Sequence, residues 1–296
     1  MGAFVGVDWG TTRLRAHLMD KEGAVVGTVE TDDGLMAARP DGFAGALERA
    51  REKLDAPGLP VAMSGMVGSR QGWVEAPYAD CPASFAAIAD HAVAAPVNGA
   101  DVLILAGVAQ GRDGSVPADV MRGEETEIAG AMAALGVAEG VFVLPGTHTK
   151  WARVEDGRIT GFRTFMTGDV FAALKGHTVL SAMMGEPTDW TAFGAGVRAD
   201  PIDLGDAMAE FFSLRAEALL VGSNPDAAAS RLSGRLIGAE ISAALGAGEQ
   251  PILVGSGAIR GAYERAFAAL DRDIVPAPQD CAARGLALAA RYWGWI

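Results

Sequence analysis

The chain has few cysteines and a shortage of positive charge. Its 296 residues include only two cysteines, Cys81 and Cys281, which excludes a disulfide scaffold and favours reduced thiols in a cytoplasm. Lysine and arginine total 24 against 37 aspartates and glutamates, so the net charge is −13. A protein that binds DNA or RNA without sequence preference needs clustered positive charge, and this balance therefore argues against a nucleic-acid partner.

Long apolar runs are missing as well. The longest aliphatic stretch, around 102–109, is far shorter than the roughly 20 residues that span a bilayer. The N-terminus has no basic segment before its apolar stretch, unlike a signal peptide. We therefore expect a cytoplasmic protein without a membrane partner. What the chain does have is 39 glycines and a hydrophobic fraction of 50%, which predict many tight turns and about two domains with cores of their own.

A pattern of three short strands occurs twice along the chain. Strands are predicted at 3–7, 13–19 and 24–30, with a glycine-threonine turn after the first and an acidic turn with glycine after the second. The same order returns at 141–165. We predict an internal structural repeat with two lobes, residues 1–136 and 137–296. Further strands are expected at 60–64, 101–106, 251–254 and 272–276, and helices at 41–54, 124–135, 232–245 and 279–292.

Both glycine-threonine turns have the residues of a phosphate site. Glycine lets an anion approach the backbone, threonine hydroxyls donate hydrogen bonds, and a carboxylate at a strand end can hold a hydrated Mg²⁺. A capped β-turn would use the same residues. A third loop, Gly255-Ser256-Gly257, lies between a predicted strand and helix and suits an anion or adenosine. Neither GxGxxG at the first strand nor GxxxxGK[ST] is present, which argues against a NAD-dependent dehydrogenase and a P-loop NTPase.

Two glycines inside the predicted helix 232–245 require an explanation, because each costs about 1 kcal/mol relative to alanine. The alternatives are close approach of another backbone or a flat ligand, and the second would place both glycines in an adenine slot. The candidate residues for a nucleotide are Asp8, Gly10, Thr11, Thr12, Gly146, Thr147, Lys150, Gly234, Gly238, Gly255, Ser256 and Gly257, with Asp8 as the ligand of Mg²⁺.

Two further segments suit the second substrate. The segment 121–127 opens a helix with several glutamates, of which one could be a general base, although acids are common in a first helical turn. The segment 63–73 follows a predicted buried strand and combines glycines with small polar residues, arginine and glutamine. That composition suits a polyol with a carboxylate, or an ordinary crossover loop. The candidate substrate residues are Ser64, Gly65, Met66, Ser69, Arg70 and Arg122.

Taken together, these motifs resemble the actin, sugar-kinase and heat-shock-chaperone ATPase superfamily. Within it, they are similar to the 2-dehydro-3-deoxygalactonokinase family. The resemblance covers nearly the whole chain and is strongest at 7–12, 63–78, 121–126, 145–151, 162–168 and 236–240. It implies an α/β fold of two duplicated ribonuclease-H-like lobes with a cleft between them.

The activity that this resemblance implies is ATP- and Mg²⁺-dependent phosphorylation of the 6-hydroxyl of 2-dehydro-3-deoxy-D-galactonate. Related sugar kinases have an aspartate after the glycine where this chain has Glu124, so Glu124 is our first candidate for the base. Glu125 is the second candidate and Asp169 the third. The alternatives are a kinase for another sugar or 2-keto-3-deoxy acid, and a non-catalytic nucleotide-gated sensor. The sequence does not decide which sugar epimer is the substrate or whether the chain forms a homo-oligomer.

Overall fold

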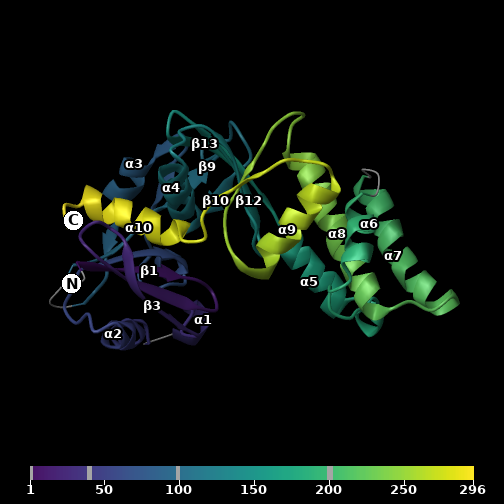
Figure 1. Cartoon of the computed structure of the whole chain (residues 1–296), viewed down its shortest axis with the longest axis horizontal. Coiled ribbons are helices and arrows are strands. Elements are labelled where there is room, and N and C mark those ends of the chain that lie inside the picture. The colour runs from purple at the N-terminus through teal and green to yellow at the C-terminus, as the bar shows by residue number, and fades with distance from the viewer. Residues whose placement is uncertain (1–2, 39–41, 98–100, 199–202) are drawn as a thin grey trace. The chain divides into compact units, whose positions relative to one another are not determined.

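The computed structural model describes residues 3–38, 42–97, 101–198 and 203–296, and the chain forms two compact units (Figure 1). Unit 1 comprises Met1–Phe142, Ala152–Phe162 and Ala277–Ile296, and unit 2 comprises Val143–Trp151 and Arg163–Pro276. The C-terminal segment thus belongs to the compact unit that contains the N-terminus. The predicted boundary between the lobes 1–136 and 137–296 stays a prediction.

Unit 1 is built on a six-stranded sheet with the order β3-β2-β1-β4-β8-β7. β1 pairs antiparallel with β2 and parallel with β4, and β4 is parallel to β8. The central strand β1 is apolar on both faces because both faces are covered. The strands of this sheet are β1 (Phe4–Trp9), β2 (Leu14–Met19), β3 (Val25–Thr31), β4 (Val61–Gly65), β7 (Val93–Ala94) and β8 (Val102–Ile104).

Helices cover the sheet of unit 1. α4 (Glu124–Leu135) and α10 (Cys281–Tyr292) lie side by side (Figure 1), and α10 packs on β1 and β4. The two helices approach closely because Gly130 faces the carbonyl of Cys281 and Gly285 faces that of Thr126, where a Cβ would have no room. A second apolar layer surrounds Trp9, whose ring contacts those of Phe43 and Trp73. The remaining helices here are α1 (Leu35–Ala38), α2 (Phe43–Lys53) and α3 (Phe85–Asp90).

A small sheet with the order β10-β9-β5 also belongs to unit 1. It consists of β5 (Tyr78–Asp80), β9 (Gly107–Gln110) and β10 (Asp119–Met121), and the sequence pattern did not predict it. A short 3-10 turn, η1 (Met66–Gly68), follows β4. β10 leads directly into α4, so this sheet positions the residues that open that helix.

The third sheet has the order β15-β14-β11-β12-β13-β6, and three of its strands have residues in both units. These three are β11 (Gly140–Leu144), β12 (Thr149–Glu155) and β13 (Arg158–Phe165); the others are β14 (Ile252–Leu253), β15 (Val275–Pro276) and β6 (Ala83–Ser84). Five of these strands repeat the order of the first sheet. Read in the reverse direction, β13-β12-β11-β14-β15 corresponds to β3-β2-β1-β4-β8. The predicted structural repeat and the α/β fold class are confirmed.

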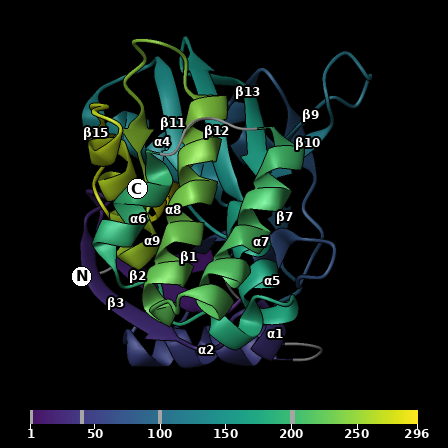
Figure 2. The same cartoon turned by 90° about the vertical axis from the view of Figure 1, so that its right-hand side faces the viewer.

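Helices dominate the rest of unit 2 (Figure 2). α8 begins at Pro225, with the Asn224 side chain accepting a hydrogen bond from the Asp226 N–H as its cap, so it is longer than the predicted 232–245. The other elements are α5 (Thr167–His177), η2 (Ser181–Met183), α6 (Trp190–Val197), α7 (Leu204–Leu220) and α9 (Gly257–Ala269).

The predicted helix 41–54 corresponds to α2, although its first residue lies outside the described ranges. The described part of the chain contains no helix with both the length and the apolar composition of a membrane span.

Candidate functional site

The ends of β1 and β4 meet the start of α4 in unit 1. Asp8 lies opposite Ser64, and Trp9 lies opposite Gly65, because the two strands are parallel and in register. A Cβ on Gly123, the residue before α4, would lie 3.2 Å from the Cα of Gly65. The fold therefore brings together three segments that were predicted separately as phosphate, substrate and base motifs.

The turn after β1 is held by its backbone. The N–H of Gly10 donates to the carbonyl oxygen of Arg13 at 2.8 Å, and the carbonyl oxygens of Gly10 and Thr11 accept from Leu35 and Met36. Gly34 lies so close to the backbone of Thr12 that it has no room for a side chain. Thr11 and Thr12 are exposed, so the turn presents its two hydroxyl groups outward.

The two glutamates that open α4 differ in their surroundings. Both carboxylate oxygens of Glu125 accept from the Gly123 N–H, at 2.8 and 2.9 Å, and its side chain is almost fully buried. Glu124 is only half-buried, and its Oε2 accepts from the N–H of Arg122 at 2.9 Å. The buried carboxylate of Glu125 thus accepts from the backbone just before the helix, and Glu124 lies nearer the surface.

Carboxylates crowd this part of unit 1. Burial raises the pKa of Asp8, and burial together with the charge of Glu124 raises the pKa of Glu125 to about 7. Glu127, one turn into α4, has its pKa raised to about 8 by burial first and by the charge of Asp8 second. The sequence pattern assigns no role to Glu127, although its spacing of three from Glu124 would place both on neighbouring positions of one helix face.

The two predicted substrate segments contain hydrogen-bond donors that no described residue uses. Nε and Nη1 of Arg122 and Oγ of Ser69 are shielded from solvent and have no hydrogen-bond partner among the residues that the structure describes. Nη2 of Arg122 donates to the carbonyl oxygen of Ala76 at 2.7 Å. A buried donor without a partner costs about 1–3 kcal/mol, so these groups indicate a place where a ligand or water supplies an acceptor.

Three other residues of this segment are placed differently. Arg70 is exposed, and Met66 in η1 packs against the core of unit 1. Tyr78, which carried no assignment, lies under the Arg122 guanidinium, with Cζ 4.3 Å from the ring centroid. Aromatic residues below an arginine have no periodic signature, so the sequence offered no signal for this contact.

In unit 2 the second glycine-threonine turn packs against the start of α5. A Cβ on Gly168 would lie 2.8 Å from the Cα of Thr147 and 3.0 Å from the carbonyl oxygen of Gly146. The exposed side chains of His148 and Asp169 also meet here, with Nε2 2.6 Å from Oδ2. Asp169, the third candidate for the base, is thus a partner of His148.

Lys150 lies on β12 and is buried. Its Nζ donates to Oγ1 of Thr164 on β13 at 2.8 Å, whereas the preceding Thr149 contacts Tyr263. Adjacent residues of a strand point to opposite faces, so these two side chains lie on different faces of the sheet.

A small cavity of about 50 Å³ adjoins the second turn. Its lining is mainly apolar and comes from the turn and from three helices: Gly146, Thr167, Gly168, Phe171, Ser233, Leu236, Ile237, Ile259 and Tyr263. Gly146 is the only residue of the predicted nucleotide set that lines it. Ser233 and Ile237, which line this cavity, are the neighbours of Gly234 and Gly238 on α8.

Gly234 and Gly238 face α6 instead. The carbonyl oxygen of Phe193 fills the space over Gly234, and a Cβ on Gly238 would lie 2.6 Å from the carbonyl oxygen of Val197. Of the two explanations for these glycines, close approach of a backbone is the one observed. This corrects their assignment to the adenine slot, since α6 occupies the position where a ligand would have to lie.

The loop 255–257 precedes α9. Gly255 and Gly257 have φ of 104° and 73°, and no described atom lies within 4 Å of a Cβ built on either one. Backbone conformation therefore explains these glycines. Ser256 is the cap residue of α9 and makes no side-chain capping bond.

Comparisons with known proteins identify the kind of site. The family described as 2-keto-3-deoxy-galactonokinase matches residues 8–289. The chain belongs to this kinase family. A curated relative from Rhizobium meliloti (strain 1021), named "Probable 2-dehydro-3-deoxygalactonokinase DgoK1", is 40% identical over 98% of this chain and 97% of its own. The 2-dehydro-3-deoxygalactonokinase of Escherichia coli (strain K12) is 30% identical over 94% of both chains.

Solved structures agree with this membership of the kinase family. One from Sinorhizobium meliloti, described as a "putative 2-dehydro-3-deoxygalactonokinase protein", has a TM-score of 0.90 at 39% identity and covers 97% of this chain and 96% of its own. Component A of the (R)-2-hydroxyglutaryl-CoA dehydratase from Acidaminococcus fermentans has a TM-score of 0.52 at 17% identity, covering 99% and 98%. At that identity the likeness extends to the fold alone.

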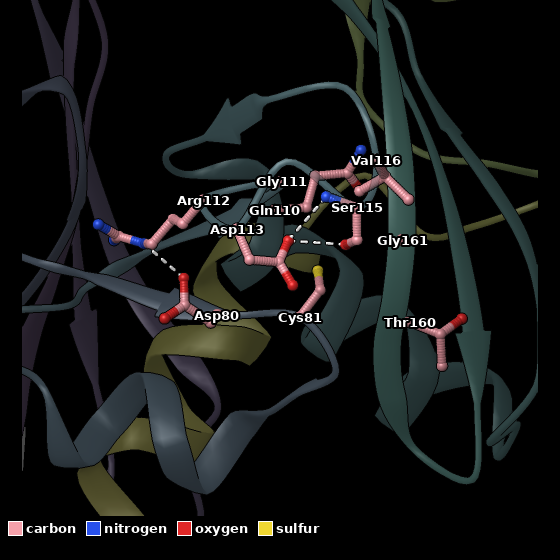
Figure 3. A pocket seen from close by; sticks show the side chains of 10 residues that line it. All are labelled: Asp80, Cys81, Gln110, Gly111, Arg112, Asp113, Ser115, Val116, Thr160 and Gly161. Atoms are coloured by element: carbon pink, nitrogen blue, oxygen red, sulfur yellow. Dashed lines mark hydrogen bonds and ion pairs between the residues drawn. The ribbon is translucent and has the colours of Figure 1, made fainter.

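A larger cavity of the kinase, about 420 Å³, lies beside the small sheet of unit 1 and contains no predicted site residue (Figure 3). Its charged groups already have partners. Nε of Arg112 donates to Asp80 at 2.5 Å, and Asp113 accepts from the N–H and the hydroxyl of Ser115. Burial raises the pKa of the Cys81 thiol to about 11, so this cysteine is a poor nucleophile at neutral pH.

Proposed function

We propose that this kinase transfers the γ-phosphoryl group of ATP to the 6-hydroxyl of 2-dehydro-3-deoxy-D-galactonate. The observation that carries the proposal is the set of unused donors on Arg122 and Ser69, next to the half-buried Glu124. A cation whose Nε and Nη1 bond no described residue, together with a hydroxyl in the same condition, suits a sugar acid, which has a carboxylate and several hydroxyl groups. The two curated relatives named for this reaction support the choice of substrate.

Glu124 is the proposed general base. Its position at the start of α4, beside the ends of β1 and β4, places a carboxylate near the proposed sugar-acid site. There it would accept the proton of the substrate hydroxyl as that oxygen attacks phosphorus. Glu125 is a weaker candidate, because both its oxygens accept from the Gly123 N–H and its side chain is buried.

Thr11 and Thr12 are proposed to donate to the phosphates of ATP, as are Gly146 and Thr147 in the matching turn. The exposure of both threonines in the first turn supports this role. The apolar cavity beside Gly146 suits the adenine base, and Gly255, Ser256 and Gly257 suit the ribose. Lys150 is the least supported member of this set, since it is buried and bonded to Thr164.

The acidic cluster of unit 1 fits a divalent cation. Burial and then the charge of Asp8 raise the pKa of Glu127, and hard carboxylate oxygens are the donors that Mg²⁺ prefers. Within the described ranges, no group of three metal-ligating side chains is preformed. Asp8 would therefore hold Mg²⁺ together with water and phosphate oxygens. When bound, the ion neutralises phosphate charge.

We further propose that the enzyme acts in the cytoplasm, without nucleic-acid or membrane partners. In this scheme residues 1–136 bind the sugar acid and phosphates, and residues 137–296 bind the nucleotide. The two cysteines and the acidic composition support the compartment and the exclusion of nucleic acid.

A coupled ADP assay with a panel of sugar acids and hexoses tests the proposed function, with ³¹P NMR of the product to locate the phosphate. We expect ADP release with the galactonate-derived acid and a phosphate ester at the terminal carbon. Faster turnover of a neutral hexose, or of another 2-keto-3-deoxy acid, would replace the substrate. Nucleotide-dependent light scattering without any phosphorylated product would identify a non-catalytic member instead.

A further inference from the structure

The aromatic ring of Tyr78 supports the guanidinium of Arg122. The Cζ of Arg122 lies over the ring, 4.3 Å from its centroid, and Nη2 donates to the carbonyl oxygen of Ala76 at 2.7 Å. A guanidinium is attracted to an aromatic face by the ring quadrupole and stacks on it. The short segment 76–78 thus holds the cation by two different contacts.

Two glycines provide the space that this arrangement requires. A Cβ on Gly107 would lie 2.7 and 2.8 Å from two ring atoms of Tyr78, its neighbour across the small sheet. A Cβ on Gly68 would lie 2.9 Å from Nη1 of Arg122. Neither glycine has a positive φ, so space and not backbone conformation explains both of them.

The supported cation lies next to the segments that meet in unit 1. Gly68 ends η1, which follows β4 directly, and Arg122 itself is two residues before the proposed base Glu124. Nε and Nη1 remain without partners among the described residues, as does the hydroxyl of Ser69. Because these groups are shielded from water, the charge of the guanidinium acts more strongly on a nearby anion than it would in solvent.

We propose that Tyr78 is a positioning residue for the sugar acid. Its ring holds the Arg122 guanidinium beside η1 and the start of α4, where the cation attracts the carboxylate of the substrate. The ring face provides this support, and the phenol hydroxyl has no part in it. The inference rests on the proposed function and adds to it a residue that acts only through Arg122.

Affinity for the sugar acid tests the proposal directly. Isothermal titration of the whole protein with 2-dehydro-3-deoxy-D-galactonate, without ATP, measures Kd. Tyr78→Leu should raise Kd about tenfold, since the cation loses its aromatic face. Tyr78→Phe keeps that face and should stay within about twofold of the wild type. Tyr292→Leu removes an exposed tyrosine that bonds Asp90 and is the matched control.

A double-mutant cycle separates positioning from a merely structural role. If Tyr78 acts through Arg122, the effect of Tyr78→Leu should nearly vanish in an Arg122→Met background. Equal losses in both backgrounds would overturn the proposal. So would an unchanged Kd in Tyr78→Leu, or a loss in Tyr78→Phe as large as in Tyr78→Leu. Tyr78→Met, with an adaptable side chain, repeats the cycle if the leucine variant does not fold.

The coupled ADP assay distinguishes this inference from the proposed function. A wild-type enzyme that phosphorylates the acid, with no change of Kd in Tyr78→Leu, overturns the role of Tyr78 alone. A wild-type protein that neither binds nor phosphorylates the acid overturns the proposed function and this inference together.

Discussion

The two repeats have the same strand order but differ in the groups that surround their carboxylates. In unit 1, Asp8, Glu125 and Glu127 lie near one another, and burial first and the charges of acidic neighbours after it raise their pKa values. In unit 2, the carboxylate of Glu240 is buried among neutral donors. It accepts from Nε1 of Trp151, from Oγ1 of Thr167 and from the hydroxyl of Tyr263.

We interpret the carboxylates of unit 1 as part of the proposed catalytic site and the Glu240 network of unit 2 as structural support. Crowded carboxylates oppose folding and bind a cation or a proton readily, which is typical of catalytic centres. A carboxylate with three donors links the elements that bear them, here β12, α5, α8 and α9. Thr167 and Tyr263 also line the small apolar cavity of unit 2, so the Glu240 network fixes the walls of the proposed adenine slot.

The largest effect is expected from the acidic site. Glu124→Gln should lower kcat about 10²–10⁴-fold, because the amide cannot accept the hydroxyl proton. ATP affinity, measured by titration calorimetry, should be nearly unchanged. A normal kcat in this variant would exclude Glu124 as the general base.

Loss of the supporting carboxylate should act on stability. Glu240→Ala removes the shared acceptor of three donors and should lower the free energy of unfolding by about 3 kcal/mol or more, measured by urea denaturation. Glu186→Ala, which removes an exposed partner of Lys175, should change it by at most about 0.5 kcal/mol. Similar values for both variants would show that the Glu240 network does not support unit 2.

The pH dependence of stability tests the crowding in unit 1. The pKa of Glu125 is raised from 4.5 to about 7, so between these values the folded state retains a proton that the unfolded chain has released. Its contribution to the free energy of unfolding is therefore present at low pH and is lost as the pH rises to about 7, by on the order of 3 kcal/mol. Denaturation of the wild type and of Glu125→Gln from pH 4.5 to 8 measures this contribution. Identical pH profiles would contradict the buried, protonated state of Glu125.

Helix packing in unit 2 gives the smallest effect of this series. Gly234→Ala forces a methyl group against the carbonyl of Phe193 and should cost about 1–3 kcal/mol. Gly261→Ala in α9 meets no atom within 4 Å and should stabilise the protein by about 0.5–1 kcal/mol, as expected for a glycine inside a helix. Thermal unfolding of both variants gives the two signs. A loss of ATP affinity in Gly234→Ala with unchanged stability would restore the adenine assignment.

Much of the fold could be predicted from the sequence, because the strands of the repeat alternate or are fully apolar and end in distinctive turns. The motifs of Asp8, Ser64 and Glu124 could be found in the sequence, but their approach to one another depends on the parallel pairing of β1 with β4 and on the position of the start of α4. The contact of Gly234 with α6 could not be predicted, since a helical glycine fits a ligand as well as a backbone. The buried donors of Ser69 and Arg122 depend on tertiary packing and leave no pattern in the sequence.

The central claim is that the acidic site of unit 1 phosphorylates a galactonate-derived acid. Steady-state kinetics with ATP, Mg²⁺ and both C4 epimers, 2-dehydro-3-deoxy-D-galactonate and 2-dehydro-3-deoxy-D-gluconate, test it most directly. The account predicts ADP release with a higher kcat/KM for the galactonate epimer. No ADP release with either epimer, while a hexose is phosphorylated, would contradict it.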